Sequence, residues 1–329
     1  MRKASAIACV VGLLVVAIAA QADEFLALEG KIALPGVAGR IDHMAVDLVR
    51  QRLLVAELGN GSVDMVDLTG GRQAQRITGL RDPQGVAYAQ KPDLVIVASG
   101  GDGSVRFYRG ADLSPVGDIP LGKDADNVRV DPRNGNIVVG YGSGGLAVID
   151  PAKRSKIGDI KLPAHPESFQ LDPASGRLFV NVPDAGQIMV ADLAGSNPVG
   201  RWAVPGLRAN FPMAIDPSGL TLATVFRNPA KLVLLDTKSG AATAQLDTCG
   251  DADDVFFDGK RRRIYVSCGA GAVDLFQGDA TGYRALARVQ TSSGARTSLF
   301  VSELDRLFVA ARAGLLGADA AILAFRPIP

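Results

Sequence analysis

The chain has 329 residues, of which 38 are Gly, and its 35 Lys and Arg residues nearly balance its 34 Asp and Glu residues. This near-neutral charge lacks the basic excess of a nucleic-acid-binding protein, so we expect no nucleic-acid partner. The length allows a large hydrophobic core. The high glycine content and the scarcity of strongly helical segments favour an all-β chain with many turns.

The N-terminal segment has the three parts of a secretory signal peptide. Residues 2–3 are basic, residues 7–19 are apolar, and residues 20–22 (Ala-Gln-Ala) form a small-x-small cleavage pattern. We therefore expect residues 1–22 to be removed and residues 23–329 to be exported, to the periplasm or outside the cell. The apolar run is shorter than the roughly 18 residues that a membrane span needs, and no other run approaches this length, so no membrane span is predicted.

A unit of about 42 residues recurs along the rest of the chain. Each copy contains an apolar stretch that ends on Asp or a substitute for it, a second apolar run, a Gly-rich turn and a third run. The first stretches end 41 to 44 residues apart, at positions 47, 89, 131, 172, 216, 258 and 302. A period of this size with several short strands per unit predicts a β-propeller, and the seven copies predict seven four-stranded blades in a single domain.

The third copy shows the strands of one blade most clearly. Residues 127–131, 136–141, 146–150 and 157–162 are short segments separated by turn residues, as expected for strands a, b, c and d of a blade. Repetition also marks the closing aspartates as scaffold, so we expect their side chains to accept hydrogen bonds from backbone N–H groups of the following turns. These residues are Asp47, Asp131, Asp172, Asp216 and Asp258.

The last copy contains only three strands and ends near Phe325. Residues 25–34, which precede the first blade, match the fourth-strand pattern found at residues 116–121. We predict that this N-terminal segment pairs into the seventh blade and closes the ring. Closure removes the exposed strand edges that an open sheet would present to other chains.

Cys249 and Cys268 are the only cysteines outside the predicted signal peptide. In an oxidising compartment, an isolated pair favours a disulfide over a metal site or a catalytic nucleophile. The repeat places Cys249 before the first strand of the sixth blade and Cys268 at the end of its second strand. Both positions lie on one face of the same blade, so we predict a disulfide between them.

The loops before the first strands, together with the loops between strands b and c, open on one face of a propeller and form the mouth of its central channel. Aligning the seven copies places polar side chains at this mouth, and they differ from blade to blade. This variation favours a ligand site over one structural device used seven times, although a structural role explains any single member equally well. The candidate ligand-binding residues are Asp42, His43, Asp126, Asn127, His165, Glu167, Asn210, Arg227, Asp253, Asp254, Arg296 and Arg312.

Two kinds of metal chemistry suit this mouth. Carboxylate oxygens that converge on an axis are hard ligands for Ca²⁺ or Mg²⁺, and the candidate metal ligands are Asp42, Asp126, Glu167 and Asp253. His43 or His165 among carboxylates suits a transition metal instead. A bound metal beside a histidine supplies a Lewis acid and a general base, which makes His43 and His165 the catalytic candidates if the protein is an enzyme.

Several strand segments share a further pattern, namely residues 145–150 (Gly-Leu-Ala-Val-Ile-Asp), 157–162, 177–181 (Arg-Leu-Phe-Val-Asn) and 264–268 (Ile-Tyr-Val-Ser-Cys). In these segments the chain resembles the YVTN-type bacterial β-propeller family, which includes YncE-like periplasmic proteins. The resemblance extends over residues 25–325 and implies a propeller fold. It implies no activity, because the motif belongs to the scaffold. The WD-repeat pattern fits less well, since the chain has one Trp and no recurring Trp-Asp pair.

These features favour an exported binding or scaffold protein with a polar, acidic-leaning pocket at the channel mouth over an enzyme. Its expected partner is a cation, a small polar ligand or another protein. The alternative is a metal-assisted hydrolase or lyase that resembles propeller lactonases in its chemistry. A third interpretation is a protein-interaction platform that uses the blade edges. On the opposite face from the mouth, we expect Arg261, Arg262 and Arg263 to be solvated at a turn.

Overall fold

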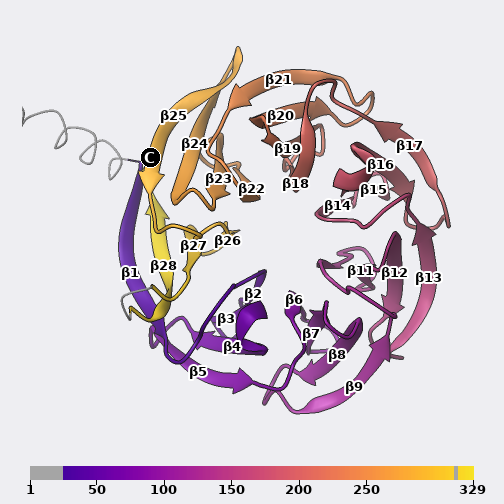
Figure 1. The fold of residues 1–329 in the computed structure, drawn as a ribbon, viewed down its shortest axis with the longest axis vertical. Helices are drawn as coiled ribbons and strands as arrows, with labels where there is room; N and C mark the ends of the chain where they lie inside the picture. Colours follow the sequence, from indigo (N-terminus) through magenta and orange to yellow (C-terminus); the bar gives the residue numbers. More distant parts are fainter. Residues whose placement is uncertain (1–24, 315–317) are drawn as a thin grey trace, which may run out of the picture.

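Seven antiparallel sheets of four strands each surround a central axis, as Figure 1 shows. The computed structural model describes residues 25–314 and 318–329, so the predicted signal peptide at 1–22 lies outside the described residues. The predicted all-β, seven-bladed propeller is confirmed. None of the helices in the described part has the length and apolar character of a membrane span.

The first and second strands of each blade lie nearest the axis. The innermost strands are β2 (Met44–Asp47), β6 (Pro83–Ala89), β10 (Val128–Val130), β14 (Phe169–Asp172), β18 (Arg208–Ile215), β22 (Ala252–Asp258) and β26 (Ser298–Val301). The second strands are β3 (Arg52–Glu57), β7 (Leu94–Ser99), β11 (Ile137–Tyr141), β15 (Arg177–Val182), β19 (Thr221–Asn228), β23 (Arg263–Cys268) and β27 (Arg306–Ala311).

The third and fourth strands complete each blade toward its rim. The third strands are β4 (Ser62–Asp67), β8 (Ser104–Arg109), β12 (Gly145–Asp150), β16 (Gln187–Asp192), β20 (Ala230–Asp236), β24 (Ala272–Asp279) and β28 (Ala320–Pro327). The rim strands are β5 (Arg72–Ile77), β9 (Pro115–Pro120), β13 (Ser155–Lys161), β17 (Pro198–Trp202), β21 (Ala242–Asp247), β25 (Gly282–Gln290) and β1 (Leu26–Leu34). Two short 3₁₀ helices, η1 (Leu58–Asn60) and η2 (Pro183–Ala185), lie between second and third strands.

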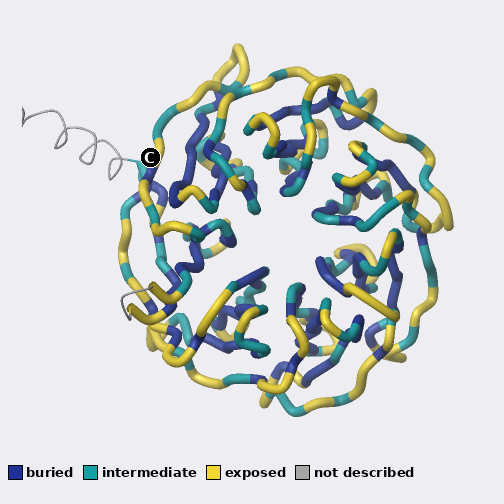
Figure 2. The backbone as a smooth tube through the Cα atoms, viewed as in Figure 1, coloured by how far each residue is buried: buried dark blue, intermediate teal, exposed yellow. Residues whose placement is uncertain are grey.

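The core lies between the blades. Every residue of β3, β7 and β23 is buried, because both faces of these strands are covered by neighbouring blades. Rim strands instead alternate between more and less exposed residues, as in β17. Figure 2 shows the exposed residues gathered on the rim and in the connecting loops. This arrangement leaves the inner ends of the blades as the place where side chains from all seven converge.

The closing aspartates cap turns, as predicted. Each accepts a hydrogen bond from a backbone N–H group two to five residues further along the chain. The pairs are Arg50 to Asp47 (3.1 Å), Arg133 to Asp131 (3.0 Å), Ala174 to Asp172 (3.1 Å), Thr221 to Asp216 (2.7 Å) and Arg261 to Asp258 (3.1 Å). The repeated carboxylates therefore belong to the scaffold.

The N-terminal strand closes the ring. β1 pairs antiparallel with β28, from Leu26 opposite Pro327 to Leu34 opposite Ala320. In Figure 1 the indigo β1 accordingly lies beside the yellow β28. The predicted closure of the seventh blade by residues 25–34 is confirmed, and the seventh sheet has the order β1-β28-β27-β26.

The prediction that all three arginines 261–263 are solvated is wrong for Arg261 and Arg263. The Arg261 side chain is buried and lies 3.0 Å from Asp258 and 2.6 Å from Asp305, and it donates to the carbonyl of Pro327 (2.9 Å). Arg263 is buried as well, with its guanidinium 5.3 Å from the ring centre of Phe25. Both side chains are drawn inward because the closing blade supplies a carboxylate, carbonyl groups and an aromatic ring.

Cys249 and Cys268 form the predicted disulfide, with their Cα atoms 5.9 Å apart. Both residues are buried in the core that blades five and six share. The backbone N–H of Cys249 also donates to the carboxylate of Asp274 on β24 (2.8 Å). The disulfide thus joins the loop before β22 to the end of β23.

Candidate functional site

The backbone fixes the mouth residues through a hydrogen-bond pair that recurs in several blades. In blade three, the N–H of Asp126 donates to the carbonyl of Gly140 (2.9 Å), and the N–H of Gly140 donates to the carbonyl of Asn127 (3.0 Å). The same pair of bonds recurs at the corresponding residues of blades one and four. In each case the second strand holds the two residues that precede the innermost strand, and this places their side chains at the mouth.

A cavity of about 30 Å³ lies at the mouth, and all four carboxylates expected as metal ligands line it. The lining residues are Arg40, Asp42, His43, Asp126, Asn127, Glu167, Ser168, Phe211 and Asp253. Within residues 25–314 and 318–329, however, no three or more His, Cys, Asp or Glu side chains are grouped so that they could hold a metal ion. The carboxylates surround the cavity without forming a preformed metal site.

Two buried oxygen atoms of this cavity lack hydrogen-bond donors. Asp126 and Asn127 are 7% and 3% exposed, and the Oδ1 atoms of both have no donor among the described residues. The nearest cationic group is Nε2 of His43, 3.7 Å from Asp126 Oδ1. Leaving a buried acceptor unpaired costs about 1–3 kcal/mol. Nε of Arg40, which also lines the cavity, is likewise buried without a hydrogen-bond partner in the described part of the chain, so the cavity offers two acceptors and one donor.

Burial disfavours the charged forms of the Glu167 and Asp42 carboxyl groups. Burial raises the pKa of Glu167 to about 7, and the charge of Asp126 adds to this effect. Burial also raises the pKa of Asp42 to about 6, although the neighbouring His43 and Arg40 oppose the shift. Glu167 has no hydrogen-bonded or ion-paired side-chain partner within the described part of the chain. A positive charge in the cavity would stabilise these carboxylates.

Arginines neutralise the carboxylates on the other side of the cavity. Asp253 forms ion pairs with Arg227 and with Arg296, the second at 3.0 Å. Arg40 pairs with Asp42 at 2.8 Å. The guanidinium of Arg227 also lies 3.6 Å from the centre of the Phe211 ring. The cavity carboxylates that have no arginine partner among the described residues, Asp126 and Glu167, thus lie on the side that blades three and four supply.

His165 lies beside the cavity and bridges blades three and four. Its Nδ1 is 2.6 Å from the carbonyl oxygen of Gly142 and 3.5 Å from Asp124, and its Nε2 is 3.9 Å from Asp126. Burial alone would lower the pKa of His165, but its contacts with Asp126, Gly142 and Asp124 outweigh burial and raise the pKa to about 9. The ring is therefore a cation near neutral pH.

The remaining three candidates do not line the mouth cavity. Asn210 is fully buried and donates to the side chain of Asn181 (2.8 Å) and the carbonyl of Gln187 (3.0 Å), which is a structural role between blades four and five. Arg312 lies near the cavity, where burial and the charges of other arginines lower its pKa. Asp254 faces the central channel below His43.

The central channel is the larger cavity, with a volume of about 440 Å³. Its lining residues come from all seven blades, and its exposed surface is about equally polar and apolar. The apolar and aromatic lining residues include Met44, Val46, Val86, Tyr88, Val128, Val130, Ile215, Val255, Phe256, Phe257, Leu299 and Phe300. The lining extends to Ser302, which follows β26 at the face opposite the mouth.

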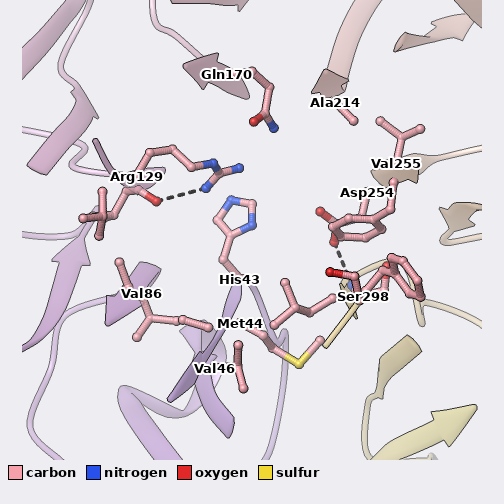
Figure 3. A pocket seen from close by; sticks show the side chains of 18 of the residues that line it. His43, Met44, Val46, Val86, Arg129, Gln170, Ala214, Asp254, Val255 and Ser298 are labelled. Carbon is pink, nitrogen blue, oxygen red and sulfur yellow. Dashed lines mark hydrogen bonds between the residues drawn. The ribbon is translucent and has the colours of Figure 1, made fainter. Parts of the chain in front are cut away.

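Polar side chains gather at the mouth end of this channel, and Figure 3 shows Arg129, His43, Gln170 and Asp254 turned toward its centre. Asp254 accepts a hydrogen bond from the N–H of Ser298 (2.7 Å). Burial raises the pKa of Asp254 to about 7, against the opposing effect of His43. His43 lines both cavities and so forms the partition between them. The channel and the mouth cavity are therefore adjacent sites that share His43 and otherwise have different lining residues.

Comparisons with known proteins show the fold and no family. No protein-family model matches this chain, and no curated protein matches it significantly. A chain of Kuenenia stuttgartiensis hydrazine synthase aligns with a TM-score of 0.76 and 14% identity, covering 88% of this chain and 98% of that one. A chain of the mitotic checkpoint complex aligns with a TM-score of 0.80 and 13% identity, covering 100% and 97%. At these identities the likeness shows the propeller fold alone.

The sequence predictions missed Arg129 and Gln170. Both occupy the position two residues before the closing position of their innermost strands, where the other blades have Ala45, Ala87, Ala214, Phe256 and Phe300. Side chains alternate along a strand, so this position faces the channel like the one two residues earlier that holds His43. At a position that holds Ala or Phe in the other blades, the charged Arg129 and the amide Gln170 could have been recognised from the sequence as channel residues.

Proposed function

We propose that this protein is an exported binding propeller that takes a cation, or the cationic group of a small polar ligand, at the mouth of its central channel. The unpaired Oδ1 atoms of Asp126 and Asn127 are the observation that carries this proposal. A cavity of about 30 Å³ has room for roughly one group of the size of water. An ion or an ammonium group fits this space, whereas a larger body would have to remain outside it.

Charge favours a cation over a neutral donor. Asp126 and Glu167 lie close enough for the charge of one to raise the pKa of the other. No arginine within the described residues forms an ion pair with either carboxylate. Oxygen ligands of this kind suit Ca²⁺ or Mg²⁺. Because the side chains are not grouped as a finished metal site, binding would draw Glu167 and Asp42 toward the ion.

Export and family membership are parts of the same proposal. The signal-like N-terminus supports export, and the Cys249–Cys268 disulfide fits an oxidising compartment such as the periplasm. The strand pattern at residues 145–150 and 264–268 supports a relationship to the YVTN-type, YncE-like propellers.

A protein is the second candidate partner. One structural neighbour comes from the mitotic checkpoint complex, so a propeller of this shape occurs in a protein assembly. Propellers host unrelated functions on one scaffold, which is why the mouth residues and not the fold decide between the two partners. A platform would tolerate changes at the mouth and respond to changes on the blade edges.

The test is a cation titration of the purified mature protein. Metal content is first measured by mass spectrometry, and the protein is then melted with chelator and with added Ca²⁺ or Mg²⁺. We expect the cation to raise the melting temperature, because it binds the folded state alone. Asp126→Asn and Glu167→Gln should each reduce the affinity for the cation about tenfold or more, since each removes a charge at the cavity.

A matched control separates the site from general charge effects. Asp118 is exposed on the rim strand β9, and Asp118→Asn should leave the cation response unchanged. An unchanged melting temperature with every cation, or an equal response in Asp126→Asn, would contradict the mouth as a cation site.

The metal-assisted hydrolase or lyase is the alternative proposal, and the same experiment bears on it. It requires a stoichiometric metal and a histidine that accepts a proton. His165 has a pKa of about 9. The pKa of His43 is also raised, because the lowering effect of burial is outweighed by the charges of Asp42 and Asp126. His43 lines the cavity and is therefore the candidate base by position. Turnover of lactones or esters that disappears in a folded His43→Ala variant would support this alternative.

A further inference from the structure

We propose that the central channel is a second binding site, for an amphipathic carboxylate whose anionic head pairs with Arg129 and whose apolar body fills the channel. The cavity of about 440 Å³ falls within the size range of small-molecule sites. This site is separate from the cation site at the mouth, although His43 borders both.

Arg129 is the anion-binding group because its donors are nearly unused. A guanidinium carries five N–H donors. Within the described residues, the only hydrogen bond of the Arg129 side chain goes to the carbonyl of Val128 (3.0 Å), and no carboxylate lies within 4.0 Å of it. Its remaining contact is with the ring of Phe169, whose centre is 5.7 Å away.

The environment of Arg129 leaves its charge only partly compensated. Burial lowers the pKa of Arg129, against the opposing effects of Asp254 and Asp126. Asp254 forms no ion pair with Arg129 and instead accepts a hydrogen bond from the N–H of Ser298 (2.7 Å). A carboxylate brought in by a ligand would supply the missing partner, and Arg binds carboxylates through two parallel hydrogen bonds.

The shape of the channel favours a ligand with one apolar body. Phe256 and Phe300 project from blades six and seven, whereas blades one, two and five carry Ala at the same height. Arg129 and Gln170 of blades three and four therefore lie across the channel from the two phenylalanines, and the alanines lie between these two groups. The lining extends from this layer to Ser302, at the face opposite the mouth.

Calorimetric titration with sodium octanoate tests the proposal, with melting temperature as a second readout. We expect octanoate to bind one per chain. Octan-1-ol, octylammonium and acetate should each bind at least about tenfold more weakly, because each lacks the charge or the apolar body. Arg129→Met should lower the octanoate affinity about tenfold or more, since it keeps the length of the side chain and removes the charge.

Two further variants keep the result interpretable. Arg129→Lys keeps the charge and should retain part of the affinity. A melting temperature of ligand-free Arg129→Met close to that of the unaltered protein would show that its loss of affinity is not a folding defect. Glu167→Gln should leave octanoate binding unchanged, whereas it weakens cation binding at the mouth. Absence of octanoate binding to the unaltered protein, equal binding by a folded Arg129→Met, or equal binding of octylammonium would each overturn the channel proposal and leave the mouth proposal standing.

Discussion

Carboxylates that line the same mouth cavity have different surroundings. Asp253 forms ion pairs with two arginines, whereas Glu167 has no such partner among the described residues and a pKa of about 7. The difference arises from which blade supplies the neighbouring side chains. Since burial disfavours the charged form of Glu167, this residue makes the folded state sensitive to pH.

Glu167→Gln should stabilise the cation-free protein at pH 8 and not at pH 4. The folded pKa of Glu167 is about 7 against an ordinary value of 4.5, so the folded state binds more protons than the unfolded state between these values. Its contribution to stability is present below about pH 4.5 and is lost as the pH rises through about 7. We expect the variant to gain about 1–3 kcal/mol at pH 8.

Urea unfolding with chelator at the two pH values measures this difference. Asp118→Asn serves as the control, because Asp118 is exposed and its change should have no comparable effect. A Glu167→Gln variant that is less stable than the unaltered protein at pH 8, with chelator present, would show that Glu167 is stabilised in its charged form after all.

At the scale of the strands, the register decides where a side chain points. β18 pairs with β19 through a register shift between Asn210 and Met213. The shift carries Asn210 into a buried hydrogen-bond network with Asn181, although its place in the repeat suggested the mouth. A repeat alignment predicts the height of a residue along the axis, but it does not reveal such a local shift.

The disulfide of blade six should stabilise the protein by constraining the unfolded chain. Its cysteines are 19 residues apart in sequence, a short loop for which the expected contribution is about 2–3 kcal/mol. Replacing both Cys249 and Cys268 with Ala should therefore lower the free energy of unfolding by at least this amount. Reducing the unaltered protein isolates the bond from the change in packing. Equal stability of the reduced and oxidised proteins would contradict this role.

At the scale of the whole molecule, the sequence predicts what repeats and misses what depends on neighbouring blades. The period places the seven innermost strands, the missing fourth strand of the last copy indicates closure by β1, and the alignment brings Asp126 and Glu167 to one cavity. The arginine pairs of Asp253 come from other blades, and the position of Arg129 lies inside an apolar strand. Such contacts depend on the spacing of blades, which no single repeat encodes.

The ring closure depends on Arg261, whose partners are up to 66 residues away in the sequence. Arg261→Ala would leave the buried carboxylate of Asp258 with the hydroxyl of Tyr265 as its remaining side-chain donor (2.7 Å) and would remove the bond to the carbonyl of Pro327. We expect a loss of about 2–4 kcal/mol of stability, because breaking a buried ion pair exposes the remaining charge to an apolar environment.

The neighbouring residue provides the control for this prediction. Arg262 is exposed and its side chain reaches the carbonyl of Asp279, so Arg262→Ala should change the stability by less than about 1 kcal/mol. Hydrogen exchange then locates the effect. If Arg261 stabilises the contact between blade seven and blade six, hydrogen exchange in β1 and β28 of the Arg261→Ala variant should accelerate more than exchange in blades two to four. Uniform acceleration in all blades would mean that Arg261 stabilises the whole ring and not its closure.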